Sequence, residues 1–153
     1  SMSIKDYTAQ IIDELGEPGV LVHGVSIKPG KPIILAKIGA KAAVGVPGHP
    51  VSAMIVCEVF IKPLVYQLAG CSGPSDATQR TLEAVVQRNI SSAAGREDYV
   101  RVVLTGENGK LLAHPILGNS AMMSTMIRAQ GYIRIGVDCE GITENSLVQV
   151  YPF

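Results

Sequence analysis

Two proline-rich loops contain the residue types best suited to binding an anion. The first is Lys28-Pro29-Gly30-Lys31-Pro32, which follows a segment rich in β-branched residues. Its two lysines offer positive charge to a phosphate or another oxyanion, and its prolines restrict the backbone before a ligand arrives. Gly30 lets a ligand approach the backbone closely. The alternative is a surface turn with solvated lysines, which this loop taken alone favours.

The second loop is Gly45–Ala53, with the sequence GVPGHPVSA, where a predicted strand meets a predicted helix. We expect the helix to begin at Pro50 or Val51, because proline is well tolerated in the first helical turn. The free N–H groups of that turn then favour an anion. Ser52 can add a hydroxyl donor, and His49 can donate a hydrogen bond or change charge near neutral pH. The alternative is an ordinary strand-to-helix connection that Ser52 caps.

Three further residues each have a chemical and a structural interpretation. Arg101 lies in an apolar strand pattern, where it is either paired on a sheet face or forms a two-pronged contact to a phosphate. Ser120 follows Gly118-Asn119 and is either a helix cap or part of an anion-binding turn. Asp6 precedes the first predicted helix and is either its cap or a ligand of Mg²⁺.

Composition restricts the class of protein. The chain has 153 residues, 47% of them hydrophobic, and its formal net charge is +0. A neutral chain without tryptophan lacks the basic surface and stacking platforms typical of nucleic-acid binding. The three cysteines form no CxxC pair, which argues against a zinc site or a disulfide scaffold and favours reduced thiols in the cytoplasm. We also expect no apolar run long enough to span a bilayer, and hence no membrane partner.

Hydrophobic periodicity predicts two different halves. Residues 1–70 read as an α/β domain whose helices cover a largely buried sheet, residues 71–75 as a linker, and residues 76–153 as a small β-barrel or sandwich. The first half contains predicted helices at 6–15 and 51–68 and strands at 19–27, 33–36 and 42–46. The second contains predicted strands at 81–88, 99–105, 111–115, 132–135 and 147–150, a hairpin turn at 107–109 and a helical insert at 120–129. The helices and strands predicted in residues 1–70 are too few to form a complete α/β layer. We therefore expect an N-terminal part to be missing.

Together these segments resemble the molybdopterin molybdotransferase family, which includes MoeA and the gephyrin E domain. The resemblance runs from about Asp6 to Phe153, and its strongest marks are the two loops in this order and at this separation. Supporting segments are Gly95–Arg101, Gly118–Ser120 and the closing Val148–Phe153. The resemblance implies the rear half of an α/β molybdopterin-binding domain, followed by a C-terminal β-barrel domain. It also implies an enzyme of molybdenum cofactor biosynthesis that inserts molybdate into adenylylated molybdopterin, uses Mg²⁺, releases AMP and forms a homodimer.

Matching motif positions assigns the site residues. Lys28 and Asp6 take catalytic positions, Asp6 as the aspartate that ends the family's GGxSxGxxD motif and as the expected Mg²⁺ ligand. The ligand-binding positions are Pro47, Pro50, Arg101 and Ser120 by their motif matches, together with Gly48, His49 and Ser52 of the second loop. The chain departs from the family pattern in three ways: GGxSxG is absent, an upstream lysine is missing near Gly24, and His49 replaces the usual asparagine. Because of His49, tungstate is an alternative to molybdate. A non-catalytic molybdopterin-binding, scaffold or dimerisation module is the competing function, and an unrelated anion-binding domain is a third. We expect the chain alone to be inactive.

Overall fold

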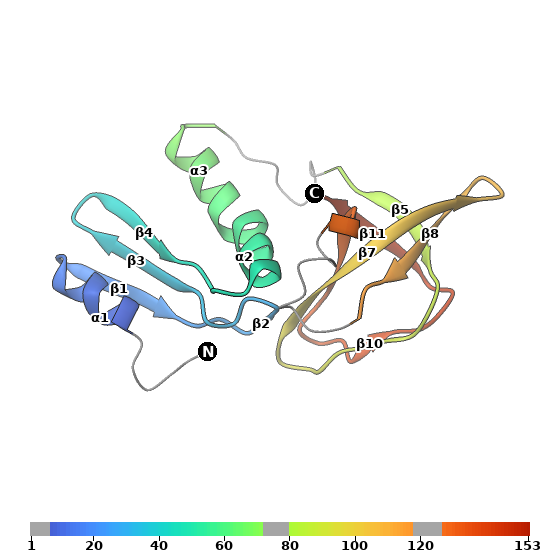
Figure 1. Ribbon diagram of the computed structural model, residues 1–153, viewed down its shortest axis with the longest axis horizontal. Coiled ribbons are helices and arrows are strands. Elements are labelled where there is room, and N and C mark those ends of the chain that lie inside the picture. The colour runs from blue at the N-terminus through green and yellow to red at the C-terminus, as the bar shows by residue number, and fades with distance from the viewer. Residues whose placement is uncertain (1–6, 72–79, 118–126) are drawn as a thin grey trace.

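The computed structural model describes residues 7–71, 80–117 and 127–153. Figure 1 shows them as a helix-and-sheet unit at the N-terminal side and a β-barrel at the C-terminal side, with β2 and α2 between the two. The predicted helical insert at 120–129 falls mostly outside the described residues, and so do Asp6 and Ser120.

The sheet of the first unit is an antiparallel meander in the order β1-β3-β4. Its elements are α1 (Tyr7–Glu14), β1 (Pro18–His23), β3 (Ile34–Ile38) and β4 (Lys41–Gly45). Only Gly39 and Ala40 connect β3 to β4, and Gly39 has a φ of 57°. A connection this short joins only antiparallel strands, and glycine adopts the left-handed conformation without a steric penalty.

Alternation along β3 directs side chains to two different helices. Ile34 and Ala36 are buried against Ile12 of α1. Ile33, just before the strand, and Leu35 point to the opposite side and pack with Ile55 of the long helix. Helices therefore cover both faces of the central strand. The expectation of a largely buried sheet is wrong for the outer strands β1 and β4, most of whose residues are exposed or half-buried.

The long helix begins at Pro50, as predicted, but it is not a regular α-helix to its end. It consists of α2 (Pro50–Val56), the π-helical turn η1 (Cys57–Ile61) and α3 (Lys62–Leu68). The Lys62 N–H donates to the Cys57 carbonyl, which is the wider π spacing. Pro63 follows directly, lacks an N–H and would clash with a carbonyl four residues before it in a regular helix. The wide turn accommodates the proline without breaking the helix.

The same helix corrects one expectation from the sequence. Within the described ranges, Pro50–Leu68 is one helix of 19 residues, long and apolar enough to cross a membrane by length and composition alone. Nineteen residues at about 1.5 Å each nearly match a bilayer core of roughly 30 Å. Three of its side chains, Val51, Ile55 and Val56, are fully buried in this structure.

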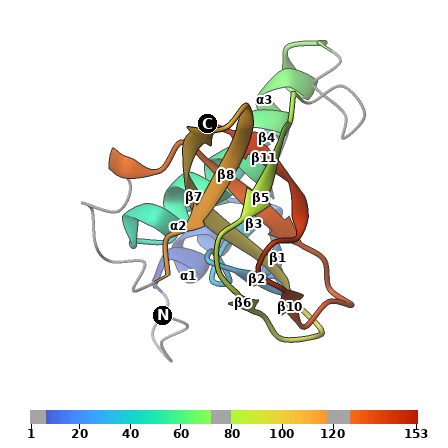
Figure 2. The same ribbon diagram turned by 90° about the vertical axis from the view of Figure 1, so that its right-hand side faces the viewer.

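The second unit is a closed barrel, which confirms the predicted short strands and selects a barrel over a sandwich. Its strands pair in the order β7-β8-β5-β11-β9, and β9 returns to β7 (Figures 1 and 2). They are β5 (Leu82–Val86), β7 (Glu97–Glu107), β8 (Lys110–Pro115), β9 (Gly131–Ile135) and β11 (Leu147–Pro152), beside a small pair of β6 (Ile90–Ser91) and β10 (Gly141–Ile142). The predicted turn is confirmed, since Asn108 and Gly109 have φ values of 50° and 75° between paired Glu107 and Lys110.

A short parallel ladder and an aromatic cluster join the two units. The strand β2 (Ile27–Lys28) pairs with the start of β7, so that Lys28 lies opposite Asp98. Tyr99 and Tyr132 of the barrel share one buried cluster with Ile55 and Val56 of the long helix. The predicted single strand at 19–27 is therefore two strands that pair with different sheets.

Candidate functional site

Lys28 lies between two pockets where the units meet. The junction pocket has a volume of about 400 Å³ and is lined by Lys28 and Pro29, by Val51 at the start of the long helix, and by residues 98–101 of β7. The loop pocket has a volume of about 530 Å³ and is lined by residues 26–32, Ser52 and residues 93–96. Because Lys28 and Pro29 line both pockets, the first proline-rich loop borders both.

Arg101 places a buried positive charge in the junction pocket. It lies in β7 opposite Tyr132 and is only 5% exposed. Removal of the guanidinium from water lowers the pKa of Arg101 from the ordinary arginine value. An arginine starts so far above neutral pH that the side chain stays charged. The pocket thus contains a partly desolvated cation, where an anion gains more than it would at an open surface.

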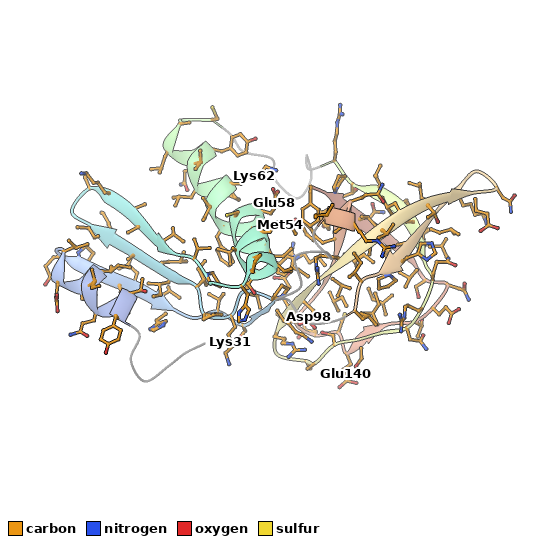
Figure 3. All side chains as sticks on the ribbon, in the orientation of Figure 1. Lys31, Met54, Glu58, Lys62, Asp98 and Glu140 are labelled. Carbon is orange, nitrogen blue, oxygen red and sulfur yellow. The ribbon has the colours of Figure 1, made fainter. Side chains whose placement is uncertain are left out.

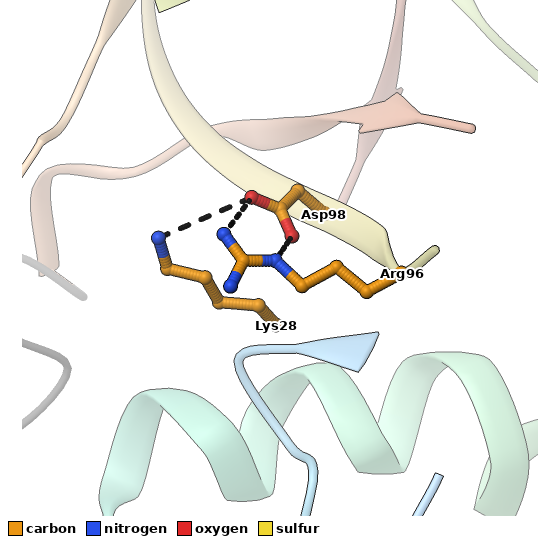
Figure 4. Close-up of polar contacts among 3 residues, drawn as sticks. All are labelled: Lys28, Arg96 and Asp98. Carbon is orange, nitrogen blue, oxygen red and sulfur yellow. Dashed lines mark hydrogen bonds and ion pairs between the residues drawn. The ribbon is translucent and has the colours of Figure 1, made fainter. Parts of the chain in front are cut away.

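Asp98 connects the cations that surround the two pockets (Figure 4). Its carboxylate, 3% exposed as a residue, accepts a bond from Arg96 Nε at 2.7 Å and one from Arg96 Nη2 at 3.2 Å. The Lys28 Nζ atom lies 4.0 Å from Asp98 Oδ2, and its own side chain is 61% exposed. Figure 3 places Asp98 at the junction between the helix-and-sheet unit and the barrel.

Sequence reasoning assigned no role to Asp98 or Arg96. Both belong to the segment that supported the resemblance, but only Arg101 was selected from it. The available signal was that Arg96 and Asp98 are two residues apart. In an extended chain this spacing puts the two opposite charges on the same face, which predicts that they pair. The pairing of Asp98 with Lys28 had no such local signal, because it depends on the ladder between β2 and β7.

The residues of the second proline-rich loop, Gly45–Ala53, do not all lie at the same pocket. His49 is the residue before the helix, has an extended backbone with φ −79° and ψ 126°, and its carbonyl accepts from the Ala53 N–H. No side chain caps this helix start. Ser52 is 6% exposed and lines the loop pocket, so the structure brings it to Lys28. Pro47 and Gly48 instead line a separate pocket of about 160 Å³.

The remaining predicted positions are not brought to Lys28 by the described residues. His49 is exposed and lines none of these three pockets, and neither does Pro50 at the first position of the helix. Among the residues that the structure describes, no group of three or more His, Cys, Asp and Glu side chains could hold a metal ion.

Known families match both units. Residues 1–67 match the family described as a probable molybdopterin binding domain, and residues 83–153 match the MoeA C-terminal region (domain IV). The chain belongs to the MoeA family. The resemblance that the two loops indicated is therefore confirmed, and so is the order of an α/β unit followed by a barrel.

Similar proteins support the same assignment. A crystal structure of a MoeA molybdopterin biosynthesis protein from a Pyrococcus species is 33% identical, with a TM-score of 0.79, and the match covers 96% of this chain and 34% of that one. The molybdopterin molybdenumtransferase of Haemophilus influenzae is 24% identical over 155 residues, which is 100% of this chain and 37% of that protein. The molybdenum cofactor synthesis protein cinnamon of Drosophila melanogaster is 29% identical, over 88% of this chain and 22% of that protein.

This MoeA-family chain spans about a third of the length of the curated relatives that it matches first. Those relatives are molybdopterin biosynthesis proteins and molybdenum cofactor synthesis proteins or transferases by name. The individual site residues rest on the motif positions and on the geometry above.

Proposed function

We propose that this chain takes part in the insertion of molybdate, or tungstate, into adenylylated molybdopterin, with release of AMP. The proposal is supported by the names of the matched transferases and by the position of Lys28 between two pockets at the junction of the two units. That position is the observation that carries the proposal, because it brings a residue of the first unit to Arg101 of the second.

The charge around the two pockets suits an anionic substrate. Although the whole chain is neutral, the described residues that line these pockets include four bases and one acid, Asp98. The bases are Lys28, Lys31, Arg96 and Arg101. Fixed cations in a partly desolvated site stabilise a dianion or a phosphate without the reorganisation that water would need.

Each side chain has a distinct part in the proposed binding. Arg101, held in the middle of a strand, offers a planar guanidinium to an oxyanion in the junction pocket. Lys28 offers a point charge that both pockets can use, and the Ser52 hydroxyl provides a neutral polar group in the loop pocket. The prolines of the first loop limit backbone motion at Lys28, so binding costs little ordering entropy.

Magnesium does not fit the residues that the structure describes. The resemblance implies Mg²⁺, but the described ranges contain no cluster of ligands for it, and Arg96 already occupies the Asp98 carboxylate. Asp6, the ligand expected from the sequence, lies outside the described residues. The proposed binding uses the described side chains of Lys28, Arg101 and Ser52. A homodimer and a cytoplasmic location are further parts of the proposal and rest on the resemblance.

Lys28→Ala tests the proposed function. We expect molybdate affinity to fall about tenfold, at the lower end for a charged hydrogen bond because the lysine is largely exposed. In a full-length protein that contains this chain, insertion of molybdate should fall with it. Lys41→Ala is the matched control, since it removes the same charge from the β3–β4 hairpin. Unchanged affinity in a folded Lys28→Ala variant would refute the assignment of Lys28.

The same assay separates the enzyme from the scaffold alternative. Insertion is measured in the full-length protein with adenylylated molybdopterin and either molybdate or tungstate, and AMP release is followed. Release of AMP that depends on the oxyanion supports the transferase. Binding of adenylylated molybdopterin without any release of AMP would instead favour a non-catalytic module.

A further inference from the structure

Asp98 is the one acidic side chain among the described residues that line the junction and loop pockets, and the other charged side chains among them are all positive. It lines the junction pocket together with Lys28 and Arg101. An anion site gains nothing directly from a carboxylate, so its presence there requires an explanation. We propose that Asp98 is a built-in counter-ion that limits how tightly anions bind and weakens binding more for ligands of higher charge. This inference rests on the proposed anion site and adds a residue that sets its specificity.

The contacts around Asp98 divide its two partners into different roles. Both carboxylate oxygens accept from Arg96, at 2.7 and 3.2 Å, so this arginine is engaged by the protein itself. Lys28 Nζ stands at 4.0 Å, beyond hydrogen-bond distance, with most of its side chain exposed. Arg96 therefore serves chiefly to compensate the buried carboxylate, while the Lys28 charge remains available to a ligand.

Geometry sets how strongly Asp98 opposes a ligand. An anion that contacts Lys28 Nζ at a hydrogen-bond distance of about 2.8 Å lies at most roughly 7 Å from Asp98 Oδ2. At that separation, with a dielectric between that of a protein surface and that of water, the repulsion weakens binding by about fivefold per unit of ligand charge. Because the repulsion is proportional to ligand charge, the factor for a dianion is the square of that for a monoanion, or about 25-fold.

Neutral substitutions of similar shape test the charge balance of the trio Lys28, Asp98 and Arg96. The wild-type trio has a net charge of one positive. Asp98→Asn raises it to two, Arg96→Gln lowers it to zero, and the double variant restores one. We therefore expect anion affinity to rise in Asp98→Asn, to fall in Arg96→Gln, and to return to within about threefold of wild type in the double variant.

The probes are molybdate and perchlorate, two tetrahedral anions of different charge. Titration calorimetry of the chain at low ionic strength and mildly alkaline pH should show Asp98→Asn binding molybdate about 25-fold more tightly than wild type and perchlorate about fivefold more tightly. Glu107→Gln is the matched control for overall charge. It lies at the far end of the same strand, nine residues on and roughly 30 Å away at about 3.3 Å per residue, and should leave both affinities unchanged.

A gain in affinity cannot come from damage to the fold, which makes the result decisive. Equal or weaker molybdate binding by a folded Asp98→Asn variant overturns the inference, and so does an equal gain for both anions. If Lys28→Ala weakens molybdate binding while Asp98→Asn does not change it, the proposed function stands and only the role of Asp98 fails. Absence of molybdate binding in both wild type and Asp98→Asn overturns the two together.

Discussion

Replacing Tyr132 with alanine tests how much the aromatic cluster between the units contributes to stability. Tyr132 is 4% exposed, stacks on Tyr151 with ring centroids 5.3 Å apart, and meets Tyr99 edge-on and Phe153 at a tilt, each at 5.6 Å. A buried aromatic ring removes about 150–250 Å² from water, which at about 25 cal/mol per Å² is an upper bound of about 4–6 kcal/mol. We expect Tyr132→Ala to lower the free energy of unfolding by about 4 kcal/mol, within the usual range for aromatic-to-alanine changes.

Urea unfolding followed by far-ultraviolet circular dichroism measures this loss. Tyr132→Phe keeps the ring contacts and should cost less than about 1.5 kcal/mol. Tyr66→Ala is the control, because Tyr66 is 37% exposed on α3 and should cost less than about 1 kcal/mol. If Tyr132→Ala lowers the free energy of unfolding no more than Tyr66→Ala does, the aromatic cluster does not stabilise the contact between the units and the reasoning is wrong.

Two further substitutions test local features. Gly131→Ala places a Cβ 2.5 Å from the Tyr151 carbonyl oxygen, so we expect it to lower the free energy of unfolding in urea by about 2 kcal/mol or more. Gly106→Ala is the control, because its Cβ would meet nothing within 4 Å and should leave the free energy of unfolding almost unchanged. Equal losses in the two variants would contradict the packing of β9 on β11. Lys62 donates to Glu58 at 2.8 Å, and this hydrogen bond raises the pKa of Lys62. Its stabilising effect is therefore present below the ordinary lysine pKa and is lost as the pH rises through the raised value. Glu58→Gln should lower the free energy of unfolding by less than about 0.5 kcal/mol at pH 7, because the Lys62 side chain is 44% exposed and the Glu58 side chain 20% exposed. The loss should vanish once the lysine has lost its proton, and a loss that persists there would contradict the pairing.

Local sequence signals predicted much of the fold. Proline and glycine placed the helix start at Pro50 and the hairpin turn at Asn108–Gly109, because their backbone preferences depend little on tertiary context. Alternating apolar residues gave the barrel strands. The pairing of β2 with β7 was not predicted, since a parallel ladder between distant segments leaves no periodic trace. The π-helical turn was also missed, although Pro63 in the middle of a helical pattern was its visible cause.

The predicted site was recovered in part. The structure brings Lys28, Ser52 and Arg101 to adjoining pockets, whereas Pro47 and Gly48 line a different one. Residue types alone do not reveal which face of a loop meets another domain, and that explains the division of the second loop. The boundaries at residues 1–70, 71–75 and 76–153, and the catalytic roles of individual residues, stay predictions.

The ladder between β2 and β7 also has a consequence for chain entropy. Lys28 and Asp98 are neighbours in space but lie 70 positions apart in the sequence. Closing a loop of that length costs the unfolded chain about 4 kcal/mol plus a constant. A site that binds an anion through both segments exists only in the folded chain. A saturating concentration of the anion therefore shifts the unfolding equilibrium toward the native state by mass action. Thermal protection by molybdate would then report the closure of this loop, even in a chain with no catalytic activity of its own.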